Sequence, residues 1–369
     1  MLYEKLIKER LDDIAFMELK EGKTIEIGEN LFTGYLPLPI MEKDLVGEIV
    51  DGKEDFNLEL ILKAAIFLGG LDKDYEYNDI YLNMLYSLHD DPKSFIMYEA
   101  MQLLKEKNIK DAIIYFNYLI NMDLDDETVL FSLGNALELY DISNLGDEDK
   151  NQFVIDMMHI YEKAISKKED FSLPYYKLGY IYALFGQYVK AKLTWEKFLK
   201  YDKNDFRRQE INEQIDYHMP NYLSEAALTY MHYGDYVRAL EFFNAKEKTQ
   251  LGDGDYYNMS ICYLELKQLD KARDCIKKAL KLNECKEYLN QLALIYKEAK
   301  KLNEAIEILE RAIDKYGSDY YLNYNLGVIQ LELGDRESAM INFEIANDIN
   351  PTDKLNQILH PEMEKYFED

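Results

Sequence analysis

The sequence predicts an all-α protein, an α-solenoid of helix–turn–helix repeats that follows an irregular N-terminal segment. The chain has 369 residues with only 17 Gly and 7 Pro, a composition that favours helices over a large β-structure. Apolar residues make up 48%, and 32 Tyr with 16 Phe supply core material, which excludes general disorder. A unit of 33 or 34 residues recurs along the chain, and this spacing decides the fold class.

The N-terminal segment, residues 1–92, does not repeat cleanly. Its first 21 residues have the apolar spacing of an amphipathic helix, without the continuous apolar centre of a signal peptide. The inner face of this helix would carry Leu2, Leu6, Leu11 and Ile14.

Thr24–Ile40 alternates at its start and contains glycines, Pro37 and Pro39, which argues against a helix. We expect extended chain, with a short hairpin as one form, packed on the array; a tether to a partner is the alternative. Residues 56–88 then predict a degenerate helix pair with its turn at Gly69-Gly70.

The repeats carry matching residues at fixed positions. They begin near Lys93, Glu127, Ser172, Pro220, Asp253, Lys286 and Tyr320. Position 8 is small in all of them: Ala100, Gly134, Gly179, Ala227, Ser260, Ala293 and Gly327. Position 24 is large: Phe116, Tyr161, Trp195, Phe243, Ile276, Leu309 and Phe343. Position 20 is alanine in six: Ala112, Ala191, Ala239, Ala272, Ala305 and Ala339.

These residue types have a packing reason. A small residue at position 8 lets the first helix approach the second, and alanine at 20 does the same beside neighbouring helices. The large residue at 24 would fill the gap between units. Two steps are longer, 45 and 48 residues, because of insertions at residues 140–150 and 204–218. The first is polar and acidic. The second predicts an added or lengthened helix, and each could be a local bend or a partner surface.

The last repeat, Tyr320–Pro351, resembles the tetratricopeptide repeat. Its signature residues are Leu326, Gly327, Ala339, Phe343, Ala346 and Pro351. Asn323 and Gln330 depart from the aromatic residues of the family pattern. The resemblance covers residues 93–353 and implies a right-handed solenoid. It divides the chain into residues 1–92, the array at 93–353 and a polar C-terminal capping helix or tail at 354–369.

The resemblance also implies a binding surface. In this family the first helix of each repeat lines a concave groove that binds peptides or partner segments. The groove positions of this sequence hold Met97, Met101, Phe131, Asn135, Glu138, Tyr176, Tyr180, Leu228, Met231, Tyr257, Ile261, Asn290, Leu294, Lys297, Tyr321, Tyr324 and Val328. Chaperone-binding members hold a C-terminal carboxylate with Lys, Asn and Arg at these places. Here only Asn290 and Lys297 are suitable, so acidic tails are not expected partners.

The groove is instead a ladder of Tyr, Phe and Met. Such a surface suits an extended or helical protein segment with apolar or basic anchors. The alternative is that about half of these aromatic residues pack between adjacent first helices.

No motif for catalysis or a cofactor is readable. The five His include no HExxH pair, and none lies beside a Cys at zinc-ligand spacing, so no metal is expected. Cys262 and Cys275 occupy interior-type positions, and a redox or metal pair is the minority interpretation. Asp72–Asn78 has the alternating oxygen side chains of a calcium loop but lacks its Gly and Glu. Three Cys in a long chain favour the reducing cytoplasm.

Charge excludes two partner classes. The formal net charge of −27 argues against nucleic acid and membranes, and no stretch is long enough for insertion. Residues 1–100 carry −12, residues 101–300 carry −6 and residues 301–369 carry −9, so the central repeats are nearest to neutral.

We therefore expect a cytoplasmic, non-enzymatic scaffold or adaptor that binds a protein or peptide segment. One alternative is a regulatory receptor for a short signalling peptide. Another is an enzyme with an unrecognised site in the N-terminal segment.

Overall fold

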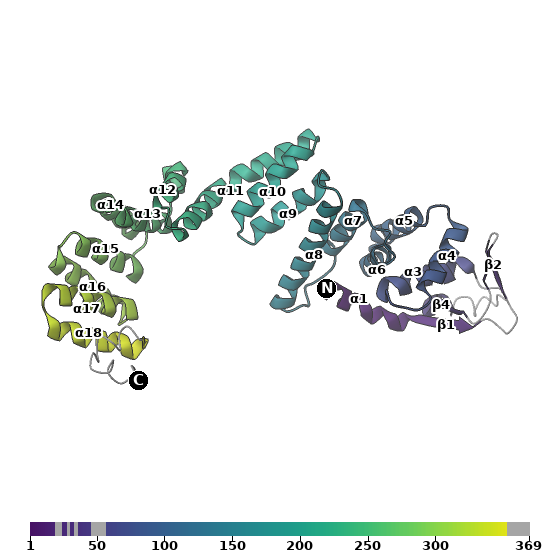
Figure 1. Ribbon diagram of the computed structural model, residues 1–369, viewed down its shortest axis with the longest axis horizontal. Helices are drawn as coiled ribbons and strands as arrows, with labels where there is room; N and C mark the ends of the chain where they lie inside the picture. Colours follow the sequence, from purple (N-terminus) through teal and green to yellow (C-terminus); the bar gives the residue numbers. More distant parts are fainter. Residues whose placement is uncertain (19–23, 28–29, 33–35, 46–56, 353–369) are drawn as a thin grey trace, which may run out of the picture. The chain divides into compact units, whose positions relative to one another are not determined.

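The computed structural model describes residues 1–18, 24–27, 30–32, 36–45 and 57–352. The chain divides into two compact units, Met1–Glu213 and Gln214–Asp369, each described here by itself. Within each unit, pairs of helices follow one another along the chain (Figure 1). The predicted all-α solenoid is therefore confirmed. No helix in the described part of the chain combines the length and apolar character needed to cross a membrane.

The repeat helices lie where the spacing predicts them. In the first unit they are α5 (Pro92–Lys105), α6 (Ile109–Asn121), α7 (Glu127–Glu138), α8 (Asp147–Lys167), α9 (Ser172–Leu184) and α10 (Tyr188–Tyr201). In the second they are α12 (Tyr236–Ala245), α13 (Asp253–Glu265), α14 (Leu269–Leu282), α15 (Lys286–Glu298), α16 (Leu302–Tyr316), α17 (Tyr320–Leu333) and α18 (Arg336–Ile349). Helix α11 (Asp205–His232) contains the boundary between the units. Five predicted repeat starts coincide with the first residue of a helix, whereas Pro220 lies inside α11.

Position 8 packs against position 24 of the same repeat. A Cβ atom added to Gly327 would lie 2.8 Å from the ring of Phe343. A Cβ atom added to Gly179 would lie even closer to the indole ring of Trp195. The large residues at position 24 are all at most 1% exposed, as are the alanines at position 20. The position-24 side chain thus fills space inside its own repeat, which the sequence had placed between units.

The first insertion lengthens the second helix of its repeat. A loop after α7 leads into α8, which spans 21 residues. Asp156, on this helix, is 2% exposed and accepts hydrogen bonds from the backbone amides of Leu2 and Tyr3, the latter at 3.3 Å. Helix α1 (Leu2–Lys8) therefore docks by its N-terminal end on α8. We expected a local bend or a partner surface at this insertion. Neither expectation included a docking site for the N-terminal helix.

We expect Asp156→Ala to release α1, because the backbone amides of Leu2 and Tyr3 lose their hydrogen-bond acceptor at a buried position. The free energy of unfolding of the first unit should fall by about 2 kcal/mol. Hydrogen exchange of residues 2–8 should accelerate. Asp149→Ala, at an exposed position on the first turn of the same helix, should cost about 0.5 kcal/mol and leave that exchange unchanged. Equal exchange in both variants would contradict the docking role of Asp156.

The prediction of one long N-terminal helix is wrong. Helix α1 ends at Lys8, and a short 3₁₀ turn, η1 (Glu9–Asp13), leads into strand β1 (Ile14–Glu18). The buried face carries Tyr3 and Ile7, each 2% exposed, while the four predicted residues are only half-buried. The Tyr3 hydroxyl donates to Asn117 Oδ1 at 3.1 Å, a contact that periodicity within one helix could not reveal.

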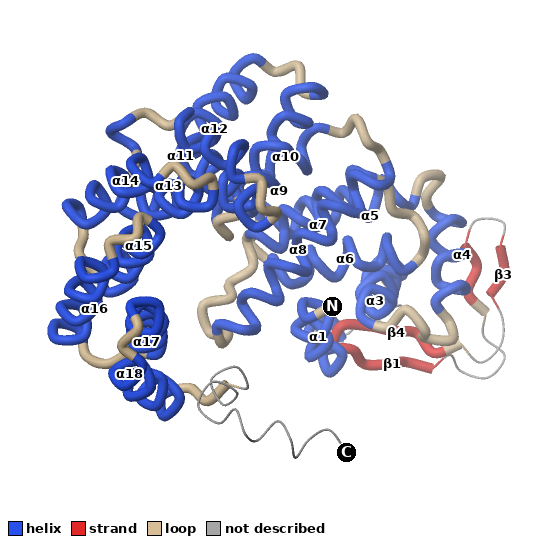
Figure 2. The backbone as a smooth tube through the Cα atoms, turned by 60° about the vertical axis from the view of Figure 1, so that its left-hand side comes forward, coloured by secondary structure: helices blue, strands red, loops and turns tan. Residues whose placement is uncertain are grey.

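Extended chain follows, as predicted for Thr24–Ile40. Strand β2 (Ile25–Ile27) pairs antiparallel with β3 (Asn30–Phe32), and residues 28–29 and 33–35 lie outside the described part. Strand β4 (Pro37–Met41) pairs antiparallel with β1, with Ile14 opposite Met41 (Figure 2). Leu38 and Ile40 are buried, and β4 packs against α3 (Leu58–Leu71).

The predicted helix pair before the array exists, but its turn lies elsewhere. Gly69 and Gly70 belong to helix α3, and the turn comes before α4 (Asn78–Leu88). A Cβ on Gly70 would overlap the backbone oxygen of Ile114, and one on Gly69 would lie 2.7 Å from the Tyr118 ring. The two glycines therefore allow α3 to approach α6 closely, and they do not form a turn.

Candidate functional site

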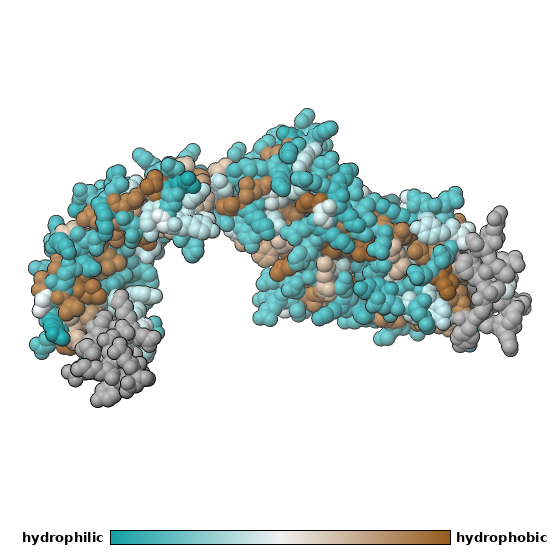
Figure 3. Space-filling model, in the orientation of Figure 1, coloured by the Kyte–Doolittle hydropathy of each residue, from teal (hydrophilic) through white to brown (hydrophobic). Residues whose placement is uncertain are grey.

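The predicted groove residues all retain solvent contact. They lie on the first helices of the repeats, α5, α7, α9, α11, α13, α15 and α17. Tyr321 is 66% exposed, Leu228 46% and Met101 42%, and most of the others are half-buried. On the face that Figure 3 shows, hydrophobic areas lie interspersed among hydrophilic ones. Exposure alone does not separate the residues that line a cavity from those that only pack between helices. Their contacts make this distinction.

Three of the predicted residues line one cavity in the second unit. Tyr257 on α13, Asn290 on α15 and Tyr321 on α17 surround a space of about 380 Å³. The remaining lining residues are Lys286, Glu287, Asp319 and Leu322. The first helices of three consecutive repeats thus converge on this space, here called the α13–α15–α17 pocket.

The Tyr257 ring is fixed by a neighbouring tyrosine. It stacks on Tyr288, with ring centroids 4.9 Å apart and planes at 28°. The Tyr288 hydroxyl in turn donates to Asp253 Oδ2 at 2.9 Å. Burial raises the pKa of Tyr257, and the negative charge of Glu287 adds to the shift. Tyr257 is therefore a neutral, fixed aromatic wall of the pocket.

Polar groups of the pocket are also oriented. Asn325 Nδ2 donates to Asn290 Oδ1 at 2.8 Å, which leaves the Asn290 amide nitrogen free to donate to a ligand. Lys286 Nζ bonds Asp319 Oδ2 at 2.6 Å. Asp319 Oδ1 also caps α17 by accepting from the Tyr321 amide at 3.0 Å. Burial alone would raise the pKa of Asp319, but these donors lower it, so this carboxylate is ionised.

In the first unit, Tyr176 and Tyr180 share a partner that the sequence did not identify. Both phenol groups donate to Glu210 Oε1, each at 2.6 Å. Glu210 lies on α11, in the part that the second insertion adds, so repeat alignment gave it no groove position. Burial raises the pKa of Tyr180, and the hydrogen bond to Glu210 raises it further. The lengthened helix thus places a carboxylate beside two predicted groove residues.

Several other predicted residues belong to the packing. Tyr161 donates to Asn135 Oδ1 at 3.1 Å and to Glu138 Oε1 at 2.7 Å, and Lys177 also bonds Glu138. Phe131 packs edge-on against Phe171. Met231, Leu294, Tyr324 and Val328 pack against the cores of their repeats. The α13–α15–α17 pocket is not lined by Met97, Met101, Leu228, Ile261 or Lys297.

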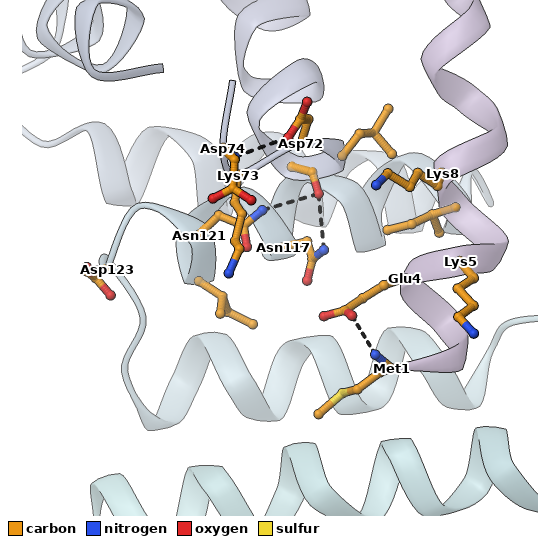
Figure 4. A pocket seen from close by; sticks show the side chains of 14 residues that line it. Met1, Glu4, Lys5, Lys8, Asp72, Lys73, Asp74, Asn117, Asn121 and Asp123 are labelled. Atoms are coloured by element: carbon orange, nitrogen blue, oxygen red, sulfur yellow. Dashed lines mark hydrogen bonds and ion pairs between the residues drawn. The ribbon is translucent and has the colours of Figure 1, made fainter. Parts of the chain in front are cut away.

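A larger, polar cavity lies at the N-terminal end of the first unit. Its volume is about 580 Å³, and α1, the turn after α3 and the end of α6 form its walls (Figure 4). Asp72 and Asp74 lie together at the turn, across from Lys8 on α1. The calcium-loop interpretation needs the side-chain oxygen of Asn78 as a ligand, but this atom is buried and lies against Gly69 of α3, while the amide nitrogen donates to the Asp72 and Lys73 carbonyl groups.

No set of three His, Cys, Asp or Glu side chains in the described residues could hold a metal. Cys262 and Cys275 are buried free cysteines, and burial raises the pKa of Cys262 to about 12. These thiols remain protonated at neutral pH and are poor nucleophiles.

The comparison with known families agrees with the helix pairs. Models described as tetratricopeptide repeat match residues 255–284, 286–314 and 320–353, which cover α13 to α18. The chain carries tetratricopeptide repeats. Tetratricopeptide repeats support a role as a protein-interaction scaffold.

Two curated relatives share part of the sequence. BBSome complex member BBS4 of Bos taurus is 30% identical over 118 residues, covering 32% of this chain and 23% of that protein. Uncharacterized protein ycf37 of Guillardia theta is 32% identical over 125 residues, covering 33% of this chain and 65% of that protein. The chain spans less than two thirds of either relative.

Two solved structures are similar to this chain at low identity. YrrB, a tetratricopeptide repeat protein with an unusual peptide-binding site, has a TM-score of 0.37 and 20% identity over 55% of this chain and 97% of its own. A crystal structure of MamA has a TM-score of 0.35 and 18% identity over 54% and 96%.

Proposed function

We propose that this protein is a non-enzymatic adaptor that binds an extended segment of another protein along the first helices of its second unit. The observation that carries the proposal is the α13–α15–α17 pocket, where three consecutive repeats each contribute a predicted groove residue. The free cysteines are consistent with action in the reducing cytoplasm. The division into residues 1–92, 93–353 and 354–369 stays a prediction, and residues 354–369 lie outside the described part.

The chemistry of the pocket suits a peptide. Its volume of about 380 Å³ can hold one large side chain. Tyr257 and Tyr321 offer wide contact area at a small loss of conformational entropy. The Asn290 amide nitrogen, oriented by Asn325, can donate to a backbone carbonyl group of the bound segment. Apolar contact and backbone hydrogen bonding are together what recognition of an extended segment requires.

The test is selection of random dodecamer peptides on the full chain, followed by measurement of dissociation constants. We expect Tyr257→Ala and Tyr321→Ala each to weaken selected peptides about tenfold or more, because each removes an aromatic contact from the pocket. Tyr233→Ala is the matched control, since Tyr233 belongs to the same unit and is 77% exposed outside the pocket. Peptides that bind all four proteins equally, or no peptides at all, would contradict the proposal.

A further inference from the structure

We propose that the segment bound in the α13–α15–α17 pocket is anchored there by a cationic side chain, arginine or lysine. This inference rests on the proposed function and adds the charge of the partner to it. The pocket combines two aromatic walls with an excess of carboxylates over cations. Those are the groups that recognise a cation on a protein.

The charges around the pocket do not cancel. Lys286 is its single lining cation, and Asp319 pairs with it at 2.6 Å. Glu287 then remains as a second, exposed carboxylate of the lining. Asp253 lies behind the aromatic wall, where neutral donors, Asn283 Nδ2 at 3.1 Å and the Tyr288 hydroxyl, keep its pKa low and its charge uncompensated. The lining therefore has two carboxylates, Glu287 and Asp319, for one ammonium group, and Asp253 adds a negative charge behind the aromatic wall.

The aromatic walls favour the same occupant. A cation over the face of a tyrosine ring is attracted by the electrons of that ring, more strongly where water is partly excluded. Tyr257 is fixed by its stack on Tyr288, and the exposed Tyr321 borders the same space. An arginine side chain lying along these rings would place its guanidinium group toward Glu287 and its aliphatic part against Leu322.

An acidic anchor finds no comparable partner. Amides at the start of a helix attract anions, and α17 begins at this pocket. However, Asp319 already accepts the Tyr321 amide and neutralises Lys286. A carboxylate from a partner would therefore approach the negative side chains of Glu287 and Asp319 without gaining an unpaired lining cation. Charge complementarity selects the basic segment, in agreement with a chain of net charge −27.

The same combination occurs independently in the first unit. Glu210 on α11 accepts from both Tyr176 and Tyr180 through one oxygen, Oε1. The two phenols fix the carboxylate without neutralising it. Its neighbour Arg207 is already paired with Asp202 at 2.8 Å. Both units thus place a carboxylate beside two tyrosines on their first helices.

The experiment uses the selected dodecamer peptides and synthetic versions of them. We expect Arg or Lys to be enriched at one position of the peptides that depend on Tyr257 and Tyr321. Replacing that residue by citrulline, a neutral isostere of arginine, or by glutamine for lysine, should weaken binding to the wild-type chain about tenfold. Glu287→Gln should weaken the basic peptide and largely abolish the difference between the charged and neutral forms. Glu310→Gln, an equal change of charge at an exposed site on α16, should preserve that difference.

The outcomes separate the two proposals. Tyrosine-dependent peptides without an enriched basic residue would leave the adaptor proposal standing and overturn the cationic anchor. The same holds if citrulline or glutamine costs as much affinity in Glu287→Gln as in the wild-type chain. Absence of any tyrosine-dependent peptide would overturn both.

Discussion

Lys246→Met should lower the free energy of unfolding of the second unit by about 3 kcal/mol, because it leaves a buried carboxylate without its cation. Lys246 and Asp255 have side chains only 6% and 11% exposed, and their charged atoms lie 2.6 Å apart. Ser224 Oγ joins the network, donating to Asp255 and accepting from Lys246, both at 2.8 Å. The network links α11, the chain after α12 and α13. Urea unfolding followed by circular dichroism measures the loss.

A double variant tests the cause. Lys246→Met with Asp255→Asn removes both charges, while the amide oxygen can still accept from the Gly252 amide that caps α13. If the uncompensated charge is responsible, the double variant should recover at least about half of the lost stability. A double variant no more stable than Lys246→Met would show that packing of the lysine stem, and not charge, accounts for the loss.

Gly179→Ala should destabilise the first unit by about 2 kcal/mol, although alanine is the better helix former. The added Cβ would overlap the indole ring of Trp195, which is 1% exposed and cannot move aside without displacing α10 from α9. Trp195 is the single tryptophan of the chain, so its fluorescence reports directly on this contact. We expect a red-shifted emission and a lower urea midpoint.

Gly254→Ala is the matched control for helix propensity. Gly254 lies within α13, and nothing stands within 4 Å of a Cβ built on it. This substitution should therefore stabilise the second unit, by about 0.5 to 1 kcal/mol. Opposite signs for the two glycines would establish that close packing at position 8 is what requires glycine. Stabilisation by both substitutions would refute that explanation.

The repeats could be predicted from sequence because their determinants are local and recur. Position 8 and position 24 contact each other within one helix pair, so residue size at fixed spacing records the contact. Three of the residues that line the α13–α15–α17 pocket had been assigned groove positions from the same register. Tyr257 and Asn290 occupy equivalent positions in successive repeats, and Tyr321 lies three residues earlier in the register of the next.

The features that the sequence missed depend on contacts across long separations. Residues Ile14–Glu18 form strand β1 because they pair with β4, and β4 lies outside residues 1–21. Periodicity within residues 1–21 therefore cannot show this pairing. Gly69 and Gly70 have the composition of a turn, but α6 makes them a site of close helix approach. Glu210 belongs to an insertion, so it has no counterpart in other repeats from which a groove position could be inferred.

The docking of α1 on α8 has a consequence for how the first unit is made. Each repeat can close its own helix pair once little more than 34 residues have been synthesised. The amides of Leu2 and Tyr3, by contrast, reach their acceptor only after Asp156 has left the ribosome, some 154 residues later in the chain. The α3–α4 pair and the first repeat, α5–α6, are already complete when Asp156 emerges, so α1 closes on α8 only after them.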